Sequence, residues 1–475
     1  MNGKIKNNIK NNNKNKDKYI ILGLRVEGQA SLEFLLTKTL PQNIVLADQN
    51  KEALKNEKLS MLSKDIPAKN LFLGDNYLDA LDSGNIVVKS AGICINKTEK
   101  LKNYIEDNKL RLSSNTDLFY ENKKGKVIAV SGSKGKSTTT TLTYEIFKNA
   151  KFDARLIGNI GNPGTYELKT ETSDTIYIFE MSSYQLENLN HKIDVGIFTS
   201  FFREHLDYHL TLENYKNAKL NLPKNIKDDG AFIYNPSLLE TLLGFSKVLD
   251  DLKCKKLASI DEHNYIKDGY IFVCDKKFIN TSELFIIGEH NYKNVLLAIR
   301  AAKLFNIEDE IIKETLRNFK PLPHRLAAVG AINGVHFIDD AISTTPESTI
   351  AAIESSSLPI YSIILGGLDR GYDFKELIEK VFKKDIKRIA FLKDSGVRIR
   401  EELIKFYELK EKEVPENKIF DSMHGIIDFC AKDAPKDTIC LLSCASPSYS
   451  IFKNYIEKGN LFREEIKRWE ENKIG

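Results

Sequence analysis

The chain has 475 residues, too many for a single hydrophobic core, and this length predicts about three domains of ordinary size. The net charge is only +4 and much of it lies in the Lys- and Asn-rich residues 1–17, so the nearly neutral remainder does not suit a dedicated nucleic-acid binder. The six cysteines form no Cys-x-x-Cys pair, no signal-peptide pattern follows the first lysines, and no apolar run reaches the roughly 18 residues of a membrane span. We therefore expect a cytoplasmic globular protein with a disordered tail at residues 1–17. These features do not give the oligomeric state, for which we expect a monomer.

The first segment, residues 18–121, alternates strands and helices, which predicts a parallel α/β sheet. KYIILGLRVEGQASLEFLLTK indicates a strand, a turn and a helix, and later strands end at Asp48 and at Ser90–Gly92. The first turn, Gly23–Gly28, is similar to a dinucleotide-binding fingerprint, but Arg25 stands where the central glycine belongs. It is either a modified phosphate-binding turn or an ordinary strand-to-helix turn.

The second segment, residues 122–321, begins with VIAVSGSKGKSTTTT, a strand, a glycine turn and a hydroxyl-rich helix start. Val130 stands where the standard phosphate-binding loop has its first glycine, and a compact variant, Gly132-x-x-Gly135-Lys136-Ser137, is present instead. Such a turn directs backbone N–H groups and the helix dipole at an anion. We expect Lys136 to reach a terminal phosphate and Ser137 to bind Mg²⁺. The alternative is a flexible surface turn.

Two further groups follow strands of the same segment, where α/β sheets place their ligand-binding residues. Glu180 ends the strand TIYIFE and is a candidate magnesium ligand; the alternative is a glutamate that faces water. FFREHLDYH contains His205, Asp207 and His209, but the His-Glu-x-x-His order of a zinc site is absent. We expect His205 to contact a second metal ion or the substrate, and His209 to be structural or on the surface.

The third segment, residues 322–475, starts near KPLPHR and continues with a hairpin-like VGAINGVHFIDD and the strands YSIILGG, RIAFL and TICLLS. This pattern predicts a further α/β domain, with domain boundaries near residues 121 and 321. Arg325 could move onto a nucleotide phosphate or remain a solvated charge. Asp339 and Asp340 could hold a nucleotide, orient a lysine, or cap the helix that begins near Pro346.

In order along the chain, the motifs G-x-x-GKS, GNIG, E-x-SS-x-QLE, EHLD, GEHN-x-x-N, LPHR, LGG and S-x-x-KNY-x-x-KGN-x-F resemble those of the Mur ligases. The resemblance covers nearly all of residues 18–475, and LPHR and the C-terminal motif are its most discriminating parts. It implies a Rossmann-like N-terminal domain for the UDP substrate (18–121), a central P-loop ATPase-type parallel-sheet domain that binds ATP (122–321) and a Rossmann-like C-terminal domain for the amino acid (322–475).

The resemblance also implies a reaction in peptidoglycan precursor synthesis. ATP phosphorylates the L-alanine carboxylate of UDP-N-acetylmuramoyl-L-alanine, and the amine of D-glutamate attacks the acyl phosphate. The alternatives are a sister ligase that adds a different amino acid, a folylpolyglutamate synthase-like enzyme, and a nucleotide-binding regulator without catalysis. The complete α/β domain before the ATP loop argues against the synthase, and the intact Lys136, Glu180 and His205 argue against the regulator.

The resemblance assigns residues to four groups, and Lys136, His205 and Lys219 are its catalytic residues. The ATP-binding positions are Gly132, Ser133, Lys134, Gly135, Lys136, Ser137, Thr138, Asn291, Asn294, Arg325 and Asp340. Two magnesium ions would be held by Ser137, Glu180, His205 and Lys219, the lysine as a carbamate. The UDP-substrate positions are Asp48, Ser90, Gly92, Asn159 and Ser182, and the D-glutamate positions are Thr344, Arg370, Ser448 and Tyr455. From its own surroundings in the sequence, Lys219 would be a solvated helix lysine.

Several residues depart from the pattern of the family. The loop reads SGSKGKS where TGTNGKS is usual, so Ser133 and Lys134 are substitutions within the phosphate-binding loop. DDAISTT replaces NDSKATN, so Ile342 stands in the place of a lysine whose charge must be lost or supplied from elsewhere. Arg370 replaces a lysine and keeps its charge, and Tyr455 replaces a phenylalanine and adds a hydroxyl group. These changes leave open which amino acid is added.

Overall fold

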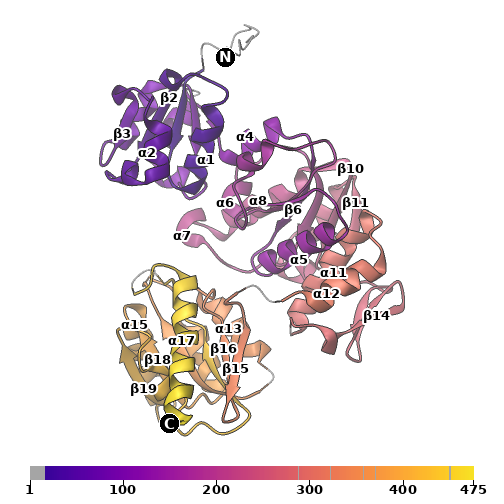
Figure 1. Cartoon of the computed structure of the whole chain (residues 1–475), viewed down its shortest axis with the longest axis vertical. Coiled ribbons are helices and arrows are strands. Elements are labelled where there is room, and N and C mark those ends of the chain that lie inside the picture. Colours follow the sequence, from indigo (N-terminus) through magenta and orange to yellow (C-terminus); the bar gives the residue numbers. More distant parts are fainter. Residues whose placement is uncertain are drawn as a thin grey trace, which may run out of the picture. The chain divides into compact units, whose positions relative to one another are not determined.

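The computed structural model describes residues 17–474 except 108, 287, 321–322, 357, 370 and 449–450. The chain forms two compact units: the first extends to Thr281 and includes Lys293–Arg317, and the second comprises Ser282–Tyr292 and the chain from Asn318. Three mainly parallel sheets follow one another along the chain (Figure 1), which confirms the predicted α/β class. The boundaries near 121 and 321 stay predictions, and residues 1–16 of the predicted tail lie outside the described residues.

The N-terminal sheet has five parallel strands in the order β3-β2-β1-β4-β5. Its strands are β1 (Tyr19–Leu22), β2 (Ile44–Asp48), β3 (Leu71–Leu73), β4 (Ile86–Lys89) and β5 (Arg111–Ser113), and its α-helices are α1 (Val26–Leu35), α2 (Glu57–Ser63), α3 (Glu99–Glu106) and α4 (Asn115–Asn122). β1 lies at the centre, and its apolar run Ile20–Leu22 is fully buried because helices cover both faces of the sheet. Chain order reverses beside β1, so its carboxyl end is where such a fold binds a ligand.

The central sheet has six parallel strands in the order β11-β10-β9-β6-β8-β7. They are β6 (Lys126–Ser131), β7 (Ala154–Gly158), β8 (Ile176–Glu180), β9 (Ile193–Phe198), β10 (Ile226–Tyr234) and β11 (Lys255–Ala258). The helices of this part of the chain are α5 (Lys136–Asn149), α6 (Ser183–Leu186), α7 (Leu206–His209), α8 (Leu212–Lys224), α9 (Leu238–Thr241), α10 (Phe245–Asp251), α11 (Glu289–Leu304) and α12 (Asp309–Asn318). β6 lies between β8 and β9, so the three segments that follow these strands meet at one edge.

A small antiparallel sheet, which the sequence did not predict, follows the central one. Its strands are β12 (Tyr265–Lys267), β13 (Tyr270–Val273) and β14 (Lys276–Asn280). These strands are only three to five residues long, and β14 begins with two lysines, so each gives a weak apolar pattern of the kind by which strands are recognised.

The C-terminal sheet has the order β15-β16-β20-β17-β18-β19, and only β15 is antiparallel to its neighbour. Its strands are β15 (Ala327–Ile332), β16 (Val335–Asp339), β17 (Ile360–Gly366), β18 (Arg388–Leu392), β19 (Glu416–Phe420) and β20 (Thr438–Leu442), and its helices are α13 (Pro346–Ser355), α14 (Lys375–Lys383), α15 (Ser395–Leu409), α16 (Ile426–Cys430) and α17 (Tyr455–Ile474). The predicted hairpin is confirmed by the β15–β16 pair.

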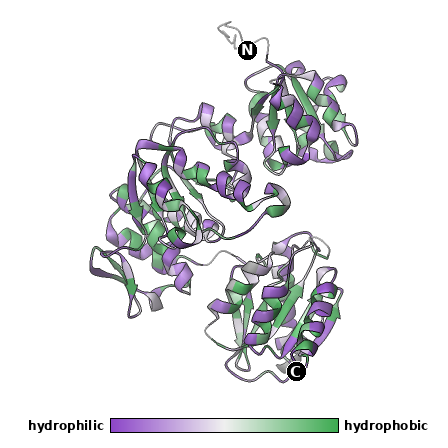
Figure 2. Ribbon diagram, turned by 180° about the vertical axis from the view of Figure 1, so that it is seen from behind, coloured by the Kyte–Doolittle hydropathy of each residue, from purple (hydrophilic) through white to green (hydrophobic). Residues whose placement is uncertain are grey.

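Successive residues of β18 belong to different cores, Ile389 and Phe391 to one and Ala390 and Leu392 to the other, so both faces of the C-terminal sheet are buried. Apolar residues gather on the strands of the sheets in Figure 2. In the part of the chain that the structure describes, no helix is both long and apolar enough to cross a membrane.

Candidate functional site

The predicted phosphate-binding loop connects the central strand β6 to helix α5. Gly132 and Gly135 have φ angles of +148° and +83°, which side chains rarely adopt. A Cβ atom at Gly132 would lie 2.1 Å from Thr199 Oγ1 and 2.9 Å from the Ser200 nitrogen, so no side chain fits there. At Gly135 it would lie 2.4 Å from Asn294 Oδ1. The first turn of α5 directs its N–H groups out of the helix, and the loop therefore has the geometry of an anion site.

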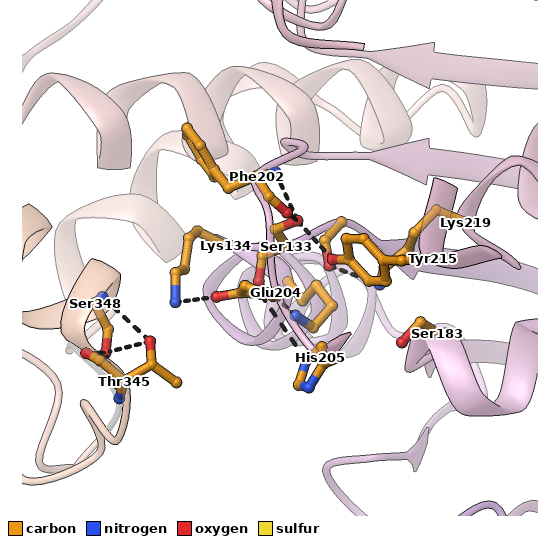
Figure 3. A network of polar contacts seen from close by, with 12 residues as sticks. Ser133, Lys134, Ser183, Phe202, Glu204, His205, Tyr215, Lys219, Thr345 and Ser348 are labelled. Carbon is orange, nitrogen blue, oxygen red and sulfur yellow. Dashed lines mark hydrogen bonds and ion pairs between the residues drawn. The ribbon is translucent and has the colours of Figure 1, made fainter. Parts of the chain in front are cut away.

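Hydrogen bonds attach this loop to the segment that follows β9 (Figure 3). The Ser133 and Lys134 nitrogens donate to Ser200, at 2.7 Å to the carbonyl oxygen and 2.8 Å to Oγ. The Ser133 hydroxyl accepts from the Phe202 nitrogen at 2.8 Å and lies 2.6 Å from Tyr215 Oη. Lys136 Nζ donates to the Ser133 carbonyl oxygen at 2.7 Å. The loop is thus held in shape by the protein, and Lys136 must exchange a carbonyl partner to bind a phosphate.

Glu180, at the end of β8, provides a test of whether a metal ion fits beside the loop. Its side chain is fully buried; Oε1 accepts from Asn159 Nδ2 at 2.8 Å, and Oε2 has no hydrogen-bond partner among the described residues. A buried carboxylate oxygen without a partner is costly. With the Ser137 hydroxyl in the first turn of α5, this oxygen suits Mg²⁺, which prefers carboxylate, hydroxyl and phosphate oxygens. Nowhere in the described residues do three His, Cys, Asp or Glu side chains gather as metal ligands.

Lys219 is buried, so the interpretation of a solvated helix lysine is wrong. Its Nζ donates to the Gly132 carbonyl oxygen at 2.8 Å and to Ser131 Oγ at 3.0 Å. Burial lowers its pKa well below the ordinary value, and Lys136 lowers it further. The apolar face of α8 gives the reason: Tyr215, Ala218, Lys219 and Leu222 have helical spacing and are all buried. This spacing is visible in the sequence and could have identified Lys219 as a residue of the buried helix face, although not its hydrogen-bond partners.

The two histidines of the EHLDYH motif have different surroundings. His205 precedes α7 in a left-handed conformation (φ 57°), and its Nδ1 lies 2.9 Å from Tyr184 Oη. About a third of its side chain is exposed, so it can reach a ligand. His209 is buried, with Nε2 2.9 Å from Ser183 Oγ and its ring against that of Tyr215. The expectation of a structural histidine fits this geometry, whereas a surface position is wrong.

Glu204 is a residue of this site that the sequence did not single out. Its side chain is only 6% exposed and forms an ion pair with Lys134 (Figure 3). Burial by itself would raise the pKa of Glu204, but Lys134 and Lys136 more than offset this and lower it below the ordinary value. The central site therefore contains an ionised carboxylate next to His205. In the sequence, the only sign of this role was that Glu204 directly precedes His205 in the EHLD motif.

The predicted UDP-substrate positions of the N-terminal sheet surround the carboxyl end of β1. Asp48 accepts from the Leu24 nitrogen at 2.7 Å, and the Ser90 hydroxyl donates to the Gly23 carbonyl oxygen at 2.8 Å. A Cβ atom at Gly92 would meet nothing within 4 Å, so a ligand has room there. The sequence missed Glu27, which accepts from the Ala91 nitrogen at 2.9 Å and joins this group of residues.

Two substrate positions lie in the central part of the chain. The Ser182 side chain caps α6 together with Gln185, whose Nε2 donates to Glu27 Oε1 at 3.0 Å. Asn159 lies against Glu180, and its backbone nitrogen donates to the Glu180 carbonyl oxygen at 2.9 Å. Glu27 and Gln185 therefore connect the Ser90–Gly92 loop to Ser182.

The predicted C-terminal positions lie at the carboxyl edge of their own sheet. Asp340 is buried and accepts from Ser443 Oγ at 2.8 Å and from the Leu326 nitrogen at 3.2 Å; burial raises its pKa to about 6, although neighbouring hydroxyls and Arg325 lower it. The Ser448 hydroxyl is buried and has no hydrogen-bond partner within the described residues. Tyr455 begins α17, with its ring 6.1 Å from that of His324.

The other predicted residues of the second compact unit have varied surroundings. Arg370 lies outside the described residues. Thr344 is half-buried in the turn before α13, and Asn291 belongs to the second compact unit, as do Arg325 and Asp340. The alternative that Asp339 and Asp340 cap α13 is wrong: the Thr345 side chain accepts from the Ser348 nitrogen. Asp339 instead binds His324 at 2.7 Å and Arg463 at 2.9 Å.

Comparison with known proteins gives consistent results. Residues 130–302 match the family model of the Mur ligase middle domain. A UDP-N-acetylmuramoylalanine–D-glutamate ligase of Caldanaerobacter subterraneus is 31% identical over 95% of this chain and 98% of its own. A ligase of the same name from Lachnoclostridium phytofermentans is 30% identical over 94% and 97%. In fold, the chain is similar to the UDP-N-acetylmuramate–alanine ligase MurC of Thermotoga maritima (TM-score 0.55, 14% identity, 96% and 100% of the two chains) and to MurF of the same organism in complex with ADP (0.55, 15%, 96% of both).

Proposed function

The chain belongs to the Mur ligase family, and on this basis we propose that it joins D-glutamate to UDP-N-acetylmuramoyl-L-alanine in an ATP-dependent reaction of peptidoglycan precursor synthesis. The observation that carries the proposal is the identity of 31% to a ligase of that name over 95% of the chain. The grouping of Lys136, Glu180 and Lys219 at one edge of the central sheet supports it, because these are the charges that phosphoryl transfer requires.

In the proposed reaction, an oxygen of the L-alanine carboxylate attacks the γ-phosphorus of ATP, and ADP leaves. The neutral amine of D-glutamate then attacks the acyl carbon, phosphate leaves with the bonding electrons, and the nitrogen releases one proton to solvent. Lys136 neutralises phosphate charge once it releases the Ser133 carbonyl oxygen, and the N–H groups at the start of α5 bind the phosphate oxygens. Asn159 holds the Glu180 carboxylate in orientation through its 2.8 Å hydrogen bond.

Mg²⁺, when bound, supplies positive charge that offsets the charge of the transferring phosphoryl group. Glu180 and Ser137 are the residues that would hold it, since Glu180 Oε2 is buried without a partner in the described part of the chain. His205 would contribute to a second ion together with Lys219. Lys219 is suited to carbamate formation, because its low pKa favours the neutral amine, which adds to CO₂ and releases a proton.

The proposal is tested by phosphate release from ATP in the presence of UDP-N-acetylmuramoyl-L-alanine and, in turn, D-glutamate, L-glutamate, D-aspartate, L-lysine and meso-diaminopimelate. Release with D-glutamate alone is the expected result. Release with a different amino acid would retain the acyl-phosphate mechanism but identify a sister activity. No release with any of them would reject the ligase assignment.

One observation favours a second candidate, a family member that adds a different amino acid. Ile342 occupies the position of a lysine in the family pattern, and its nitrogen donates to the His324 carbonyl oxygen at 3.0 Å. An isoleucine cannot bind a carboxylate, so a cation from another position must do so if the amino acid is acidic. The amino-acid panel distinguishes the two candidates.

A further inference from the structure

The phosphate-binding loop of this chain carries a second cation. Lys134 lies two residues before Lys136, and its ammonium group forms an ion pair with Glu204 (Figure 3). About a quarter of the Lys134 side chain is exposed, whereas the Glu204 side chain is almost fully buried. The carboxylate of this ion pair is therefore largely shielded from solvent.

Glu204 lies where an unneutralised carboxylate would oppose phosphate binding. It directly precedes His205, and Glu204 Oε2 lies 3.9 Å from His205 Nε2. Lys134, Lys136 and His205 are the charged groups that act on it. In a buried setting, repulsion between this carboxylate and a polyphosphate is weakly screened by solvent and salt.

The two lysines of the loop have different partners in the free protein. Lys136 donates to the Ser133 carbonyl oxygen at 2.7 Å, a neutral partner that a phosphate oxygen can replace with a net gain. Lys134 binds the Glu204 carboxylate, a charged partner that it would have to abandon in order to bind phosphate. Lys136 also lowers the pKa of Glu204, but of the two lysines it is Lys134 that forms the ion pair with this carboxylate.

We infer that Lys134 is a built-in counter-cation of Glu204, which allows the loop to bind a nucleoside diphosphate or triphosphate in the absence of a divalent metal ion. This inference rests on the proposed ATP site and adds a specific role for a residue of this chain. Asparagine at the same position cannot neutralise Glu204, and nucleotide binding then depends on the divalent cation. Lys134 is a positioning residue in this sense, because it acts through Glu204.

The test is the affinity for ADP, measured by isothermal titration calorimetry with EDTA and, separately, with saturating Mg²⁺. Lys134→Asn should weaken ADP binding in EDTA by about tenfold or more, and Mg²⁺ should reduce the difference to less than about threefold. Adding Glu204→Gln to Lys134→Asn should restore the affinity in EDTA. Lys148→Asn removes an exposed lysine from α5, the helix that follows the loop, and serves as the charge-matched control. Thermal unfolding of each variant verifies that it is folded.

Each other outcome overturns a defined part of the inference. Equal ADP affinity of wild type, Lys134→Asn and Lys148→Asn in EDTA would overturn it entirely. An equal loss with and without Mg²⁺, without rescue by Glu204→Gln, would make Lys134 a direct phosphate ligand instead. If the wild-type protein failed to bind ADP even with Mg²⁺, the proposed ATP site itself would be rejected, and this result differs from both of the others.

Discussion

Asp340 should destabilise the C-terminal unit at neutral pH, and Asp340→Asn should remove this effect. Burial raises the pKa of Asp340 from 3.8 to about 6, although Ser343, Ser443 and Arg325 act in the opposite direction. At about 1.4 kcal/mol for each pH unit, this shift corresponds to about 3 kcal/mol. The Asp340 side chain is almost fully buried, so solvent does not screen the effect appreciably.

The pH window follows from the direction of the shift. Between about pH 4 and pH 6 the folded protein holds the Asp340 proton and the unfolded chain has lost it, so the free energy of unfolding decreases as pH rises. Above about pH 6 Asp340 lowers the free energy of unfolding by the full amount, and below about pH 4 it does not lower it. The amide of the Asp340→Asn variant does not titrate, and its oxygen can still accept from the Leu326 nitrogen as the carboxylate does. The stability advantage of Asp340→Asn should therefore grow from near zero at about pH 4 to about 3 kcal/mol at about pH 7.5.

Urea unfolding, monitored by tryptophan fluorescence, measures the difference in unfolding free energy between the wild type and Asp340→Asn in the compact unit that contains Asp340. Trp469 is the single tryptophan of the chain, and it is buried in the second compact unit against Phe337. Asp437→Asn is the control, because Asp437 is exposed and has a left-handed φ of 59° that asparagine tolerates. An advantage of Asp340→Asn that is independent of pH, or that decreases as pH rises, would refute the reasoning.

Three further variants test the central site. Lys219→Ala should abolish activity while added short-chain carboxylates restore part of it; unchanged activity would exclude a carbamate. Glu180→Gln should reduce Mg²⁺ affinity by about tenfold to a hundredfold, as measured by the Mg²⁺ dependence of ADP binding, and an unaltered dependence would remove Glu180 from the metal site. Gly132→Ala should destabilise the protein by about 1–3 kcal/mol in thermal or urea unfolding, because the new Cβ would collide with Thr199 and the Ser200 backbone; wild-type stability would show that the loop can shift.

The parallel sheets could be predicted because their strands are continuous apolar runs, such as VIAV before the loop and IYIF before Glu180. The phosphate-binding loop was predictable for a different reason: its glycines have a fixed spacing, follow a strand and precede a helix. The β12–β14 sheet was missed because its strands have only three to five residues each, and β14 begins with two lysines. Side-chain partners were harder to predict: Thr345, and not an aspartate, caps α13, because the chain turns once more after Asp340.

Lys219 and Glu204 show why charged residues of a site escape sequence analysis. Either residue, taken alone, would be assigned to the surface, since isolated charges are rarely buried. In the structure the two lie on different segments, within α8 and after β9, and each becomes tolerable because the other segments supply its partners: Gly132 for Lys219 and Lys134 for Glu204. Such pairing depends on the order of strands in the sheet, which a single sequence does not specify.

The free protein already satisfies the charges that nucleotide binding would use. Lys136 binds a carbonyl oxygen of its own loop, Lys134 binds Glu204, and Lys219 binds the Gly132 carbonyl oxygen. The affinity for a nucleotide is therefore the difference between phosphate contacts and these internal contacts, and not the sum of the phosphate contacts. Lys136 exchanges a neutral partner for an anion and gains, whereas Lys134 would lose a buried carboxylate by the same exchange. This difference predicts that the two lysines, only two residues apart, have separable effects on nucleotide binding.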